Sequence, residues 1–330
     1  MSLDKTTFLI VGGAGYIGSH MTLMLHELGH QVIVVDNLST GFEDAVIGAK
    51  FIRADIHDYH NLDQIFMSHS IDVVMHFAAH IDVGESVRDP FKYYRNNVVA
   101  TQTLLECMVA NKVNHFVFSS TAAIFGEPEY VPIDEAHIKQ PINPYGHSKL
   151  MVEQMLESYD QAYGLKSICL RYFNAAGADP KTRLGERHDP ETHLIPLVLQ
   201  VASGRRDAIS IFGDDYDTQD GTCVRDYIHI VDLCKAHLLA AECMLREKAS
   251  QRFNLGNGNG YSIKQLIDIA MRVTNKEIII QSSSRREGDP ATLVADSTLV
   301  KNILNWEPEY PDLEEIILHA WKWELKHFNR

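Results

Sequence analysis

A run of glycines near the start of the chain constrains its fold more than any other feature. The apolar run Phe8–Val11 leads directly into Gly12-Gly13-Ala14-Gly15-Tyr16-Ile17-Gly18, and apolar residues with helical spacing follow from Ile17 to Leu28. The pattern predicts a strand, a glycine turn and a helix in that order. Glycines at such a turn let the backbone approach a phosphate closely, and the helix N-terminus attracts negative charge. The sequence therefore predicts a phosphate-binding loop.

Short runs of apolar and β-branched residues recur along the first half of the chain, separated by stretches with helical spacing. They lie at Gln31–Val35, Phe51–Ile52, Ile71–His76, His115–Phe118 and Ser167–Leu170. Alternating strands and helices are typical of a parallel sheet with helices on both faces. We therefore predict an α/β fold with a doubly wound parallel sheet of the Rossmann type.

This alternation breaks after about Tyr172, where a polar stretch containing Gly and Pro begins. We predict a Rossmann domain over residues 1–175 and a smaller mixed α/β substrate-binding domain over residues 176–330, with segments that return to the Rossmann sheet. The run Gly256–Gly260 resembles a second phosphate loop. Because Ser262 and Gln265 directly after it form a capping box, we predict a plain turn into a helix instead.

Asp36 ends the second expected strand, 18 residues after Gly18. In a dinucleotide-binding fold, a carboxylate at this position accepts hydrogen bonds from the adenosine ribose. It also repels a 2′-phosphate, so NAD is favoured over NADP. A turn or helix-capping role is the alternative for Asp36. Together with the glycine loop, the aspartate predicts that the first domain binds NAD.

Tyr145 and Lys149 stand four residues apart, so on a helix they share one face. We expect the ammonium to favour the ionised phenol, which can take a proton from an alcohol while hydride passes to an oxidised nicotinamide. Thr121 ends the expected strand His115–Thr121, where a hydroxyl can hold the substrate oxygen; a turn after the strand is the alternative. The three residues predict redox chemistry on an alcohol.

Bulk composition excludes several kinds of protein. The 330 residues carry a formal net charge of −14, whereas a nucleic-acid-binding surface is basic. The five cysteines are scattered and odd in number, which favours reduced thiols in a cytoplasmic protein. The first apolar run is too short for a signal or membrane segment, and no later run is long enough to span a bilayer. We expect a cytoplasmic protein with no nucleic-acid or membrane partner.

Two polar clusters allow more than one interpretation. The loop His188–His193 lacks cysteines and the helical His-Glu-x-x-His pattern, and the chain has 17 histidines, so no metal site is expected there. Arg225 and the pair Arg285 and Arg286 are basic in an acidic chain. Solvation at the surface explains them, and so does a diphosphate ligand, which guanidinium groups bind with two hydrogen bonds.

The chain resembles the UDP-hexose 4-epimerases of the extended short-chain dehydrogenase/reductase family over nearly its whole length. The motifs that carry the resemblance are Val11–His20, Asp36–Leu38, His76–Ala79, Val83–Ser86, Tyr145–Lys149, Arg171–Asn174, Phe212–Tyr216, Asp220–Thr222, Val224–His229 and Arg285–Asp289. The first few belong to the whole superfamily. The block from Asp220 to His229 is much more specific to hexose epimerases.

This resemblance implies inversion at C4 of UDP-glucose or UDP-galactose through a 4-keto sugar, with NAD regenerated in each turnover, in a homodimer. It implies that Tyr145 is the base, that Lys149 tunes it and holds the nicotinamide ribose, and that Thr121 fills the Ser/Thr position. The implied cofactor-binding residues are Gly12, Gly15, Tyr16, Ile17, Gly18, Asp36, Asn37, Asp55, Ile56, Phe77, Ala78, Ala79, Asn96, Ser119, Tyr145, Lys149 and Phe173. The implied substrate-binding residues are Thr121, Asn174, His193, Leu194, Ser210, Phe212, Arg225, Arg286, Asp289 and Leu293. Two positions depart from the family: His193 replaces a common asparagine, and Ile81 replaces a lysine that some members carry near the cofactor.

Several other activities stay open. The hexose could be N-acetylglucosamine or glucuronate, and a nucleotide-sugar dehydratase or decarboxylase begins with the same oxidation. Those enzymes commonly place an acidic residue after the Ser/Thr position, where this chain has Ala122 and Ala123. A silent NAD-binding sensor or a dehydrogenase that releases NADH is a further alternative. Leu293 stands where some relatives carry a larger tyrosine, so we expect weaker activity on UDP-N-acetylglucosamine beside the main activity.

Overall fold

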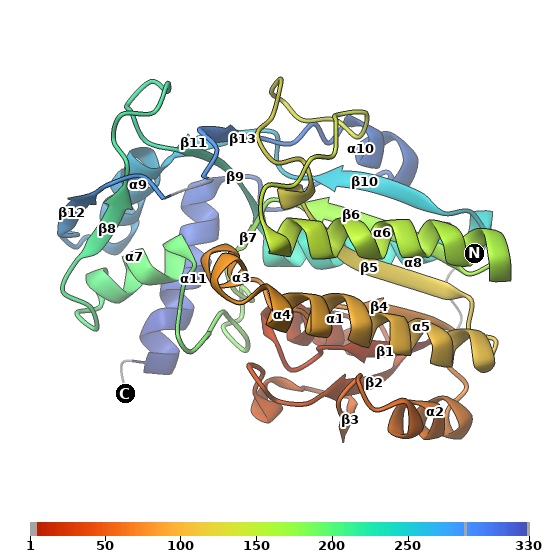
Figure 1. Ribbon diagram of the computed structural model, residues 1–330. Coiled ribbons are helices and arrows are strands. Elements are labelled where there is room, and N and C mark those ends of the chain that lie inside the picture. The colour runs from red at the N-terminus through yellow and green to blue at the C-terminus, as the bar shows by residue number, and fades with distance from the viewer. Residues whose placement is uncertain (1–4, 287–288, 329–330) are drawn as a thin grey trace. The chain divides into compact units, whose positions relative to one another are not determined.

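A seven-stranded sheet is built from six strands that lie before residue 173 and one later strand (Figure 1). The computed structural model describes residues 5–286 and 289–328. The strand order is β10 (Gln251–Leu255), β6 (Lys166–Tyr172), β5 (His115–Thr121), β4 (Val73–His76), β1 (Thr7–Val11), β2 (Gln31–Asp36) and β3 (Lys50–Arg53). The pairs that join β1 to β2 and β4, β2 to β3, and β4 to β5 are all parallel. The predicted doubly wound α/β fold is confirmed.

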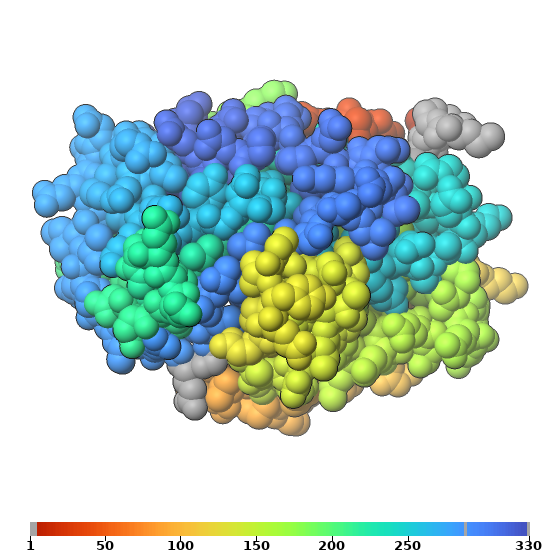
Figure 2. Space-filling model, turned by 90° about the horizontal axis from the view of Figure 1, so that it is seen from above, coloured from red at the N-terminus to blue at the C-terminus, as the bar shows by residue number. Residues whose placement is uncertain are grey.

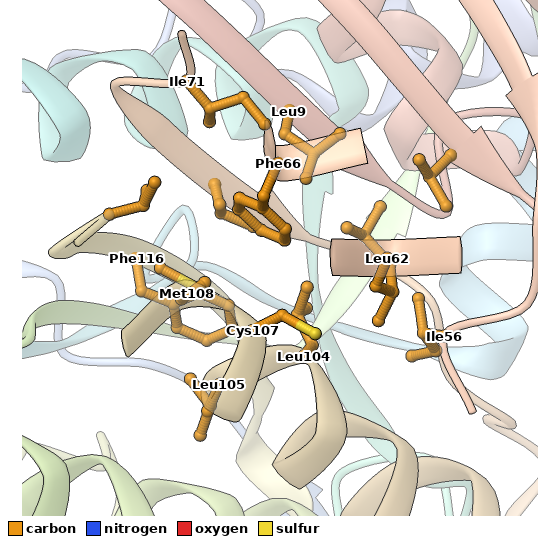
Figure 3. Packing of buried hydrophobic residues seen from close by; sticks show 14 of the residues in the cluster. Leu9, Ile56, Leu62, Phe66, Ile71, Leu104, Leu105, Cys107, Met108 and Phe116 are labelled. Carbon is orange, nitrogen blue, oxygen red and sulfur yellow. The ribbon is translucent and has the colours of Figure 1, made fainter. Parts of the chain in front are cut away.

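Both faces of the sheet are buried, which explains why its strands are continuous apolar runs. Leu9 and Val11 of β1 pack in one cluster with α2 (Tyr59–Ser68), α5 (Ala100–Ala110) and α6 (Pro144–Tyr163). Figure 3 shows Leu9, Leu62 and Phe66 within this cluster. Phe8 and Ile10 point to the opposite face of β1 and are fully buried as well. Helix α1 (Tyr16–Glu27) contacts β1 and β2.

Three short helical segments connect β4 to α5: α3 (Val83–Arg88), α4 (Pro90–Tyr93) and a π-helix over Tyr94–Val99. Asn97 in the π-helix is buried. Its amide accepts from His80 N (2.9 Å) and donates to His80 O (3.0 Å) and to Ser148 Oγ on α6 (3.1 Å). Short 3-10 helices lie at Glu43–Ala45 and Ala122–Ile124. Because π-helical turns are frequent at functional sites, this segment is a place to look for ligand contacts.

The described chain divides into two compact units. The first comprises residues up to Gly126, Lys139–Arg171 and Cys234–Phe253. The second comprises Glu127–Ile138, Tyr172–Leu233 and the residues from Asn254 onward. Most of α8 (Ile230–Glu247) and of β10 lies in the last segment of the first unit, so the chain returns to the seven-stranded sheet after leaving it.

Two small sheets and four helices build the second unit. One sheet has the order β11 (Gly260–Ser262), β9 (Val224–His229), β13 (Thr292–Leu293), with β7 (Asn174–Ala176) also paired to β9; the other joins β12 (Ile280–Ser283) to β8 (Ile209–Phe212). The helices are α7 (Leu194–Ala202), α9 (Ile263–Thr274), α10 (Thr298–Leu304) and α11 (Leu313–Phe328). Helices α7, α9 and α11 share one apolar core. The capping box of Ser262 and Gln265 starts α9, so the predicted turn into a helix is confirmed.

The loop Glu127–Ile138 joins the second unit by backbone pairing. Ile133 N donates to Val294 O, and Asp296 N donates to Ile133 O, both at 2.8 Å. Figure 2 shows this loop in yellow at the surface, beside blue C-terminal residues. All five cysteines are buried and none forms a disulfide. Among the described helices, none combines the length and the apolar character that crossing a membrane requires.

Candidate active site

The glycine loop joins β1 to α1 with little room for side chains. Gly12 has φ +80°, and a Cβ on it would lie 2.5 Å from Ala78 N at the end of β4. A Cβ on Gly18 would lie 2.2 Å from Gly12 O. Helix α1 begins at Tyr16, and its first turn has no acidic residue and no side-chain cap. The loop therefore presents backbone N–H groups and the positive helix end to an anion.

Asp36 fixes this loop from the end of β2. One carboxylate oxygen accepts from Ala14 N (3.0 Å) and the other from Leu38 N (2.8 Å). Burial raises the pKa of Asp36, and these two hydrogen bonds oppose the rise. Nearby, Asn37 Nδ2 donates to Asp55 Oδ2 (2.9 Å). Asp36 thus makes the backbone contacts expected of a turn residue. It also lies beside the glycine loop, as a ribose contact requires.

Further expected cofactor residues line the same edge of the sheet. The N–H groups of Phe77 and Ala78 donate to Val11 O at 2.8 and 3.2 Å, which continues β4 beside the glycine loop. Ile56 is buried in the core under β3. Asn96 Nδ2 donates to Asn97 Oδ1 (3.0 Å) in the π-helix. Ala79, like Tyr16, Ile17 and Ser119, belongs to the first unit, whereas Phe173 belongs to the second.

Tyr145 lies in the first turn of α6, where Asn143 caps the helix by accepting from Gly146 N (2.8 Å). A Cβ on Gly146 would lie 2.4 Å from Ala123 O, so glycine allows α6 to start against the end of β5. This packing brings the Tyr145 hydroxyl to Thr121, which is hydrogen-bonded to it. Thr121 Oγ1 also accepts from Ala123 N (3.1 Å).

Lys149 is buried one turn further along α6. Its Nζ donates to Ser119 O (2.8 Å) and lies 4.7 Å from the centroid of the Phe118 ring. Burial lowers the pKa of Lys149 to about 7. Burial also raises the pKa of Tyr145, with only the Thr121 hydrogen bond opposing it. Burial thus opposes the charged form of both side chains in the cofactor-free protein, and the role of Lys149 in favouring the phenolate stays a prediction.

His237 on α8 also takes part in this site, and sequence reasoning did not find it. Its Nε2 lies 3.1 Å from Ser119 Oγ, and its ring lies 5.0 Å from that of Phe77. Ser119 thus bonds His237 through its hydroxyl and Lys149 through its carbonyl. No motif or spacing links residues 119 and 237, so only the packing of α8 on the sheet reveals the contact.

The second unit brings several expected substrate residues together. On β9, Arg225 Nη2 donates to Asp289 Oδ1, and Arg225 stands in register with Leu293 of β13. The Arg286 guanidinium stacks 3.9 Å from the centroid of Phe212, at the end of β8 that also holds Ser210. Asn174 Nδ2 donates to Asp226 O (2.9 Å), and Leu194 begins α7. Glu287 and Gly288 of the Arg285–Asp289 motif lie outside the described residues.

His193 belongs to a tight polar cluster with Glu186, His188 and Glu191. His193 Nδ1 is hydrogen-bonded to Glu186 Oε1. Although burial opposes it, hydrogen bonds with Glu186 and Glu191 raise the pKa of His188 to about 10. Sequence reasoning overlooked Glu186, which stands just before the histidine-rich loop that it considered. A wider window on the same loop would have included it.

Comparison with known proteins identifies the family of the chain. Residues 8–256 match the family described as the NAD dependent epimerase/dehydratase family. The UDP-glucose 4-epimerase of Halalkalibacterium halodurans is 54% identical over 319 residues, 97% of this chain and 96% of that protein. A solved UDP-glucose 4-epimerase has a TM-score of 0.96 at 50% identity, covering 98% of this chain and 99% of that one. The enzyme from Bifidobacterium longum, solved with NAD+ and UDP, has a TM-score of 0.92 at 36% identity, covering 98% and 99%. Taken with the glycine loop and the Tyr145 and Lys149 pair, these likenesses show that the chain belongs to the NAD-dependent epimerase/dehydratase family.

Proposed function

We propose that this protein interconverts UDP-glucose and UDP-galactose by inversion at C4, with NAD as a bound cofactor. The observation that carries the proposal is the hydrogen bond between Thr121 and Tyr145, one helical turn from buried Lys149, in the unit that also holds the glycine loop. Relatives and solved structures of high similarity are UDP-glucose 4-epimerases, and one of them was solved with NAD+ and UDP.

The residues of the first unit fit a dinucleotide. Because a Cβ at position 12 would collide with Ala78 N, glycine lets the loop lie against the end of β4, and the N-terminus of α1 supplies positive charge with no acidic residue in its first turn. The Asp36 carboxylate supplies the acceptor that a ribose diol needs and disfavours a 2′-phosphate. When bound, NAD accepts a hydride from C4 of the sugar and returns it to the opposite face.

Tyr145 is the proton acceptor in this proposal. Its phenolate oxygen takes the proton of the sugar 4-hydroxyl and the resulting phenol gives that proton back, while the Thr121 hydroxyl holds the same substrate oxygen. Since burial raises the pKa of Tyr145, the phenolate needs nearby positive charge. The Lys149 ammonium is one source, and the cationic ring of an oxidised cofactor is the other. The base is then strongest only in the loaded enzyme.

Residues of the second unit are the proposed UDP site. The Arg225 guanidinium is held by Asp289 and by the carbonyl oxygens of Val224 and Ala291, and its remaining N–H groups are the proposed donors to a diphosphate. Arg286 is fixed over Phe212 and offers a second cation. Asn174, His193, Leu194 and Ser210 complete the proposed contacts. Replacing Arg225 or Arg286 with Ala should weaken UDP binding and leave bound NAD unchanged. If both variants bind UDP with the affinity of wild type, these residues do not belong to the proposed site.

Product identification tests the reaction. Purified protein given UDP-galactose should form UDP-glucose until the two sugars reach equilibrium, with no stoichiometric release of NADH. Accumulation of NADH would indicate a dehydrogenase, a product that has lost water would indicate a dehydratase, and retained NAD without turnover would indicate a sensor. The absence of a carboxylate at Ala122 and Ala123 counts against the dehydratase.

The sugar preference is tested by the same assay on other substrates. Leu293 lies beside Arg225 in the β9 and β13 register and is smaller than tyrosine. We expect measurable but weaker turnover of UDP-N-acetylglucosamine, because leucine leaves more room for an acetamido group than tyrosine does. Leu293→Tyr should suppress that turnover selectively, because the apolar contact that it changes is worth only roughly 1–3 kcal/mol for the glucose form. An equal fall in kcat/KM for both sugars would assign the discrimination to another residue.

The active species is proposed to be a cytoplasmic homodimer. Large apolar side chains are exposed on neighbouring helices of the first unit: Val87 on α3, Phe91 on α4, Val99 in the π-helix and Met151 on α6. Helices α3 and α4 and the π-helix all pack against α6. A second copy that covers these side chains would remove apolar surface from water. The five reduced cysteines suit a reducing compartment.

A further inference from the structure

Four metal-ligating side chains converge in the second unit, between β7 and α7. The ligand atoms of Glu186, His188, Glu191 and His193 all lie within 4.8 Å of one another. Two imidazoles and two carboxylates make a donor set of two nitrogens and two oxygens. Such a set is typical of borderline divalent metals, whereas Ca²⁺ and Mg²⁺ prefer oxygen ligands in larger number.

The loop that carries these ligands is held firmly by α11. Trp323 Nε1 donates to Glu186 O (3.1 Å), and a Cβ on Gly185 would lie only 2.3 Å from the Trp323 ring. The loop backbone therefore presses against the indole. This contact places the buried Glu186 carboxylate without using either of its oxygens.

Backbone groups of the loop hold the second carboxylate. Glu191 Oε1 accepts from Thr192 N (2.8 Å) and from His193 N (3.0 Å). The rings of His188 and His193 stand edge to face with centroids 5.1 Å apart. The Glu191 carboxylate is thus positioned by backbone N–H groups and the Glu186 backbone by Trp323, and metal sites need supporting contacts of this kind around their ligands.

Two of the separations between ligand atoms match a tetrahedral ion of ordinary size. Ligand bonds of about 2.0–2.2 Å put neighbouring donor atoms roughly 3.3–3.5 Å apart. His188 Nδ1 lies 3.2 Å from Glu186 Oε1 and 3.5 Å from Glu191 Oε1. His193 Nδ1 is closer to Glu186 than such an edge, because the two are hydrogen-bonded. The His193 side chain is 41% exposed, so it has room to turn and widen that contact.

We propose that Glu186, His188, Glu191 and His193 bind one divalent transition-metal ion of the Zn²⁺ class. Two carboxylates balance the charge of the dication, and His188 and His193 complete the tetrahedron as neutral imidazoles, so metal binding releases the proton that the Glu186 and Glu191 contacts hold on His188 near neutral pH. The proposed reaction uses no metal, but His193 is also one of the proposed UDP contacts, so the metal site borders the proposed UDP site. The competing interpretation is a purely structural network in which hydrogen bonds and ion pairs tie the loop together.

Metal titration distinguishes the two interpretations. Tag-free full-length protein, treated with chelator and then desalted, is titrated with Zn²⁺ by calorimetry and with Co²⁺ by visible absorption, in the absence of UDP-sugar. We expect one equivalent of each metal to bind, and the intense d–d bands of tetrahedral Co²⁺ to appear. His188→Gln and His193→Gln should each weaken Zn²⁺ binding by about tenfold or more.

The control is His60→Gln, which removes an exposed histidine on α2 and should bind Zn²⁺ as wild type does. Thermal unfolding of each variant without metal shows whether it is folded. If His188→Gln does not fold, His193→Gln still tests the proposal, because the His193 side chain is partly exposed. The proposal is overturned if wild-type protein does not bind one equivalent of Zn²⁺ saturably. It is also overturned if His193→Gln and His188→Gln are folded and bind Zn²⁺ with the affinity of wild type. Because turnover plays no part in this readout, its failure leaves the proposed epimerase function untouched.

Discussion

At the scale of single residues, the Tyr145 hydroxyl is the group whose proton matters most. This hydroxyl is hydrogen-bonded to Thr121, and Tyr145 lies in the first turn of α6. Tyr145→Phe keeps the ring and removes only the hydroxyl, so the fold and bound NAD should persist. Turnover should fall roughly 10²–10⁴-fold, the usual effect of losing a positioned acid or base. Tyr163→Phe, at the exposed end of the same helix, is the control and should turn over normally. Turnover near that of wild type in Tyr145→Phe would contradict the assignment.

Lys149 makes stability depend on pH. Burial lowers its folded pKa to about 7 from an ordinary value of 10.5. Between these values the unfolded chain binds more protons than the folded one, so this residue makes the free energy of unfolding rise with pH. From pH 7 to 9 the rise is about 2 kcal/mol at most.

Lys149→Met removes this contribution. Urea unfolding of cofactor-free protein at pH 7 and pH 9 should show a smaller increase, or a larger decrease, in the variant than in wild type. Comparing the two proteins cancels the titration of other groups. If both change equally between the two pH values, Lys149 is not a desolvated amine in the folded protein.

At the scale of elements, the end of β2 connects cofactor choice with the shape of the glycine loop. Asp36 accepts from two backbone N–H groups, so its loss affects the loop as well as the ribose contact. Asp36→Ala should weaken NAD retention and reduce the difference in affinity between NAD and NADP. Asp36→Asn keeps a hydrogen-bond acceptor but not the charge, so it should retain more NAD than Ala while also reducing this difference. Bound nucleotide in purified protein and competition between the two cofactors measure both effects. If Asp36→Ala retains as much NAD as wild type, the residue serves only the turn.

The elements of the first unit were predictable because each carries a local signal. Strands β1 to β6 are apolar runs, and the glycine loop and the Tyr145 spacing lie next to their ends. The second unit gives weaker signals, since β7 has three residues and β13 has two, and both depend on β9 as a distant partner. The bond between Ser119 and His237 and the gathering of Glu186 with His193 arise from packing. Residues 119 and 237 share no period or motif, whereas Glu186 stands just before the histidine-rich loop and is within reach of a wider reading of that loop.

At the scale of the whole molecule, a net charge of −14 must coexist with a phosphorylated ligand. Arg225 and Arg286 are the local cations proposed to meet that need, whereas self-association has to overcome the overall repulsion between copies. An apolar interface is therefore the kind that suits a dimer of this chain. Phe91 is 70% exposed and Val87 62% exposed, on helices that pack against α6.

Phe91→Asp tests the proposed homodimer. A carboxylate buried without a partner is strongly unfavourable, so the dissociation constant of the dimer should rise by about tenfold or more, which corresponds to roughly 1.4 kcal/mol. Met67→Asp on α2 is the matched control, because Met67 is 75% exposed and belongs to the same unit. Sedimentation velocity over a range of concentrations should show a dimer for wild type and for Met67→Asp, and a shift toward monomer for Phe91→Asp. If wild type sediments as a monomer, or if Phe91→Asp remains as dimeric as the control, the helices around α6 are not the interface.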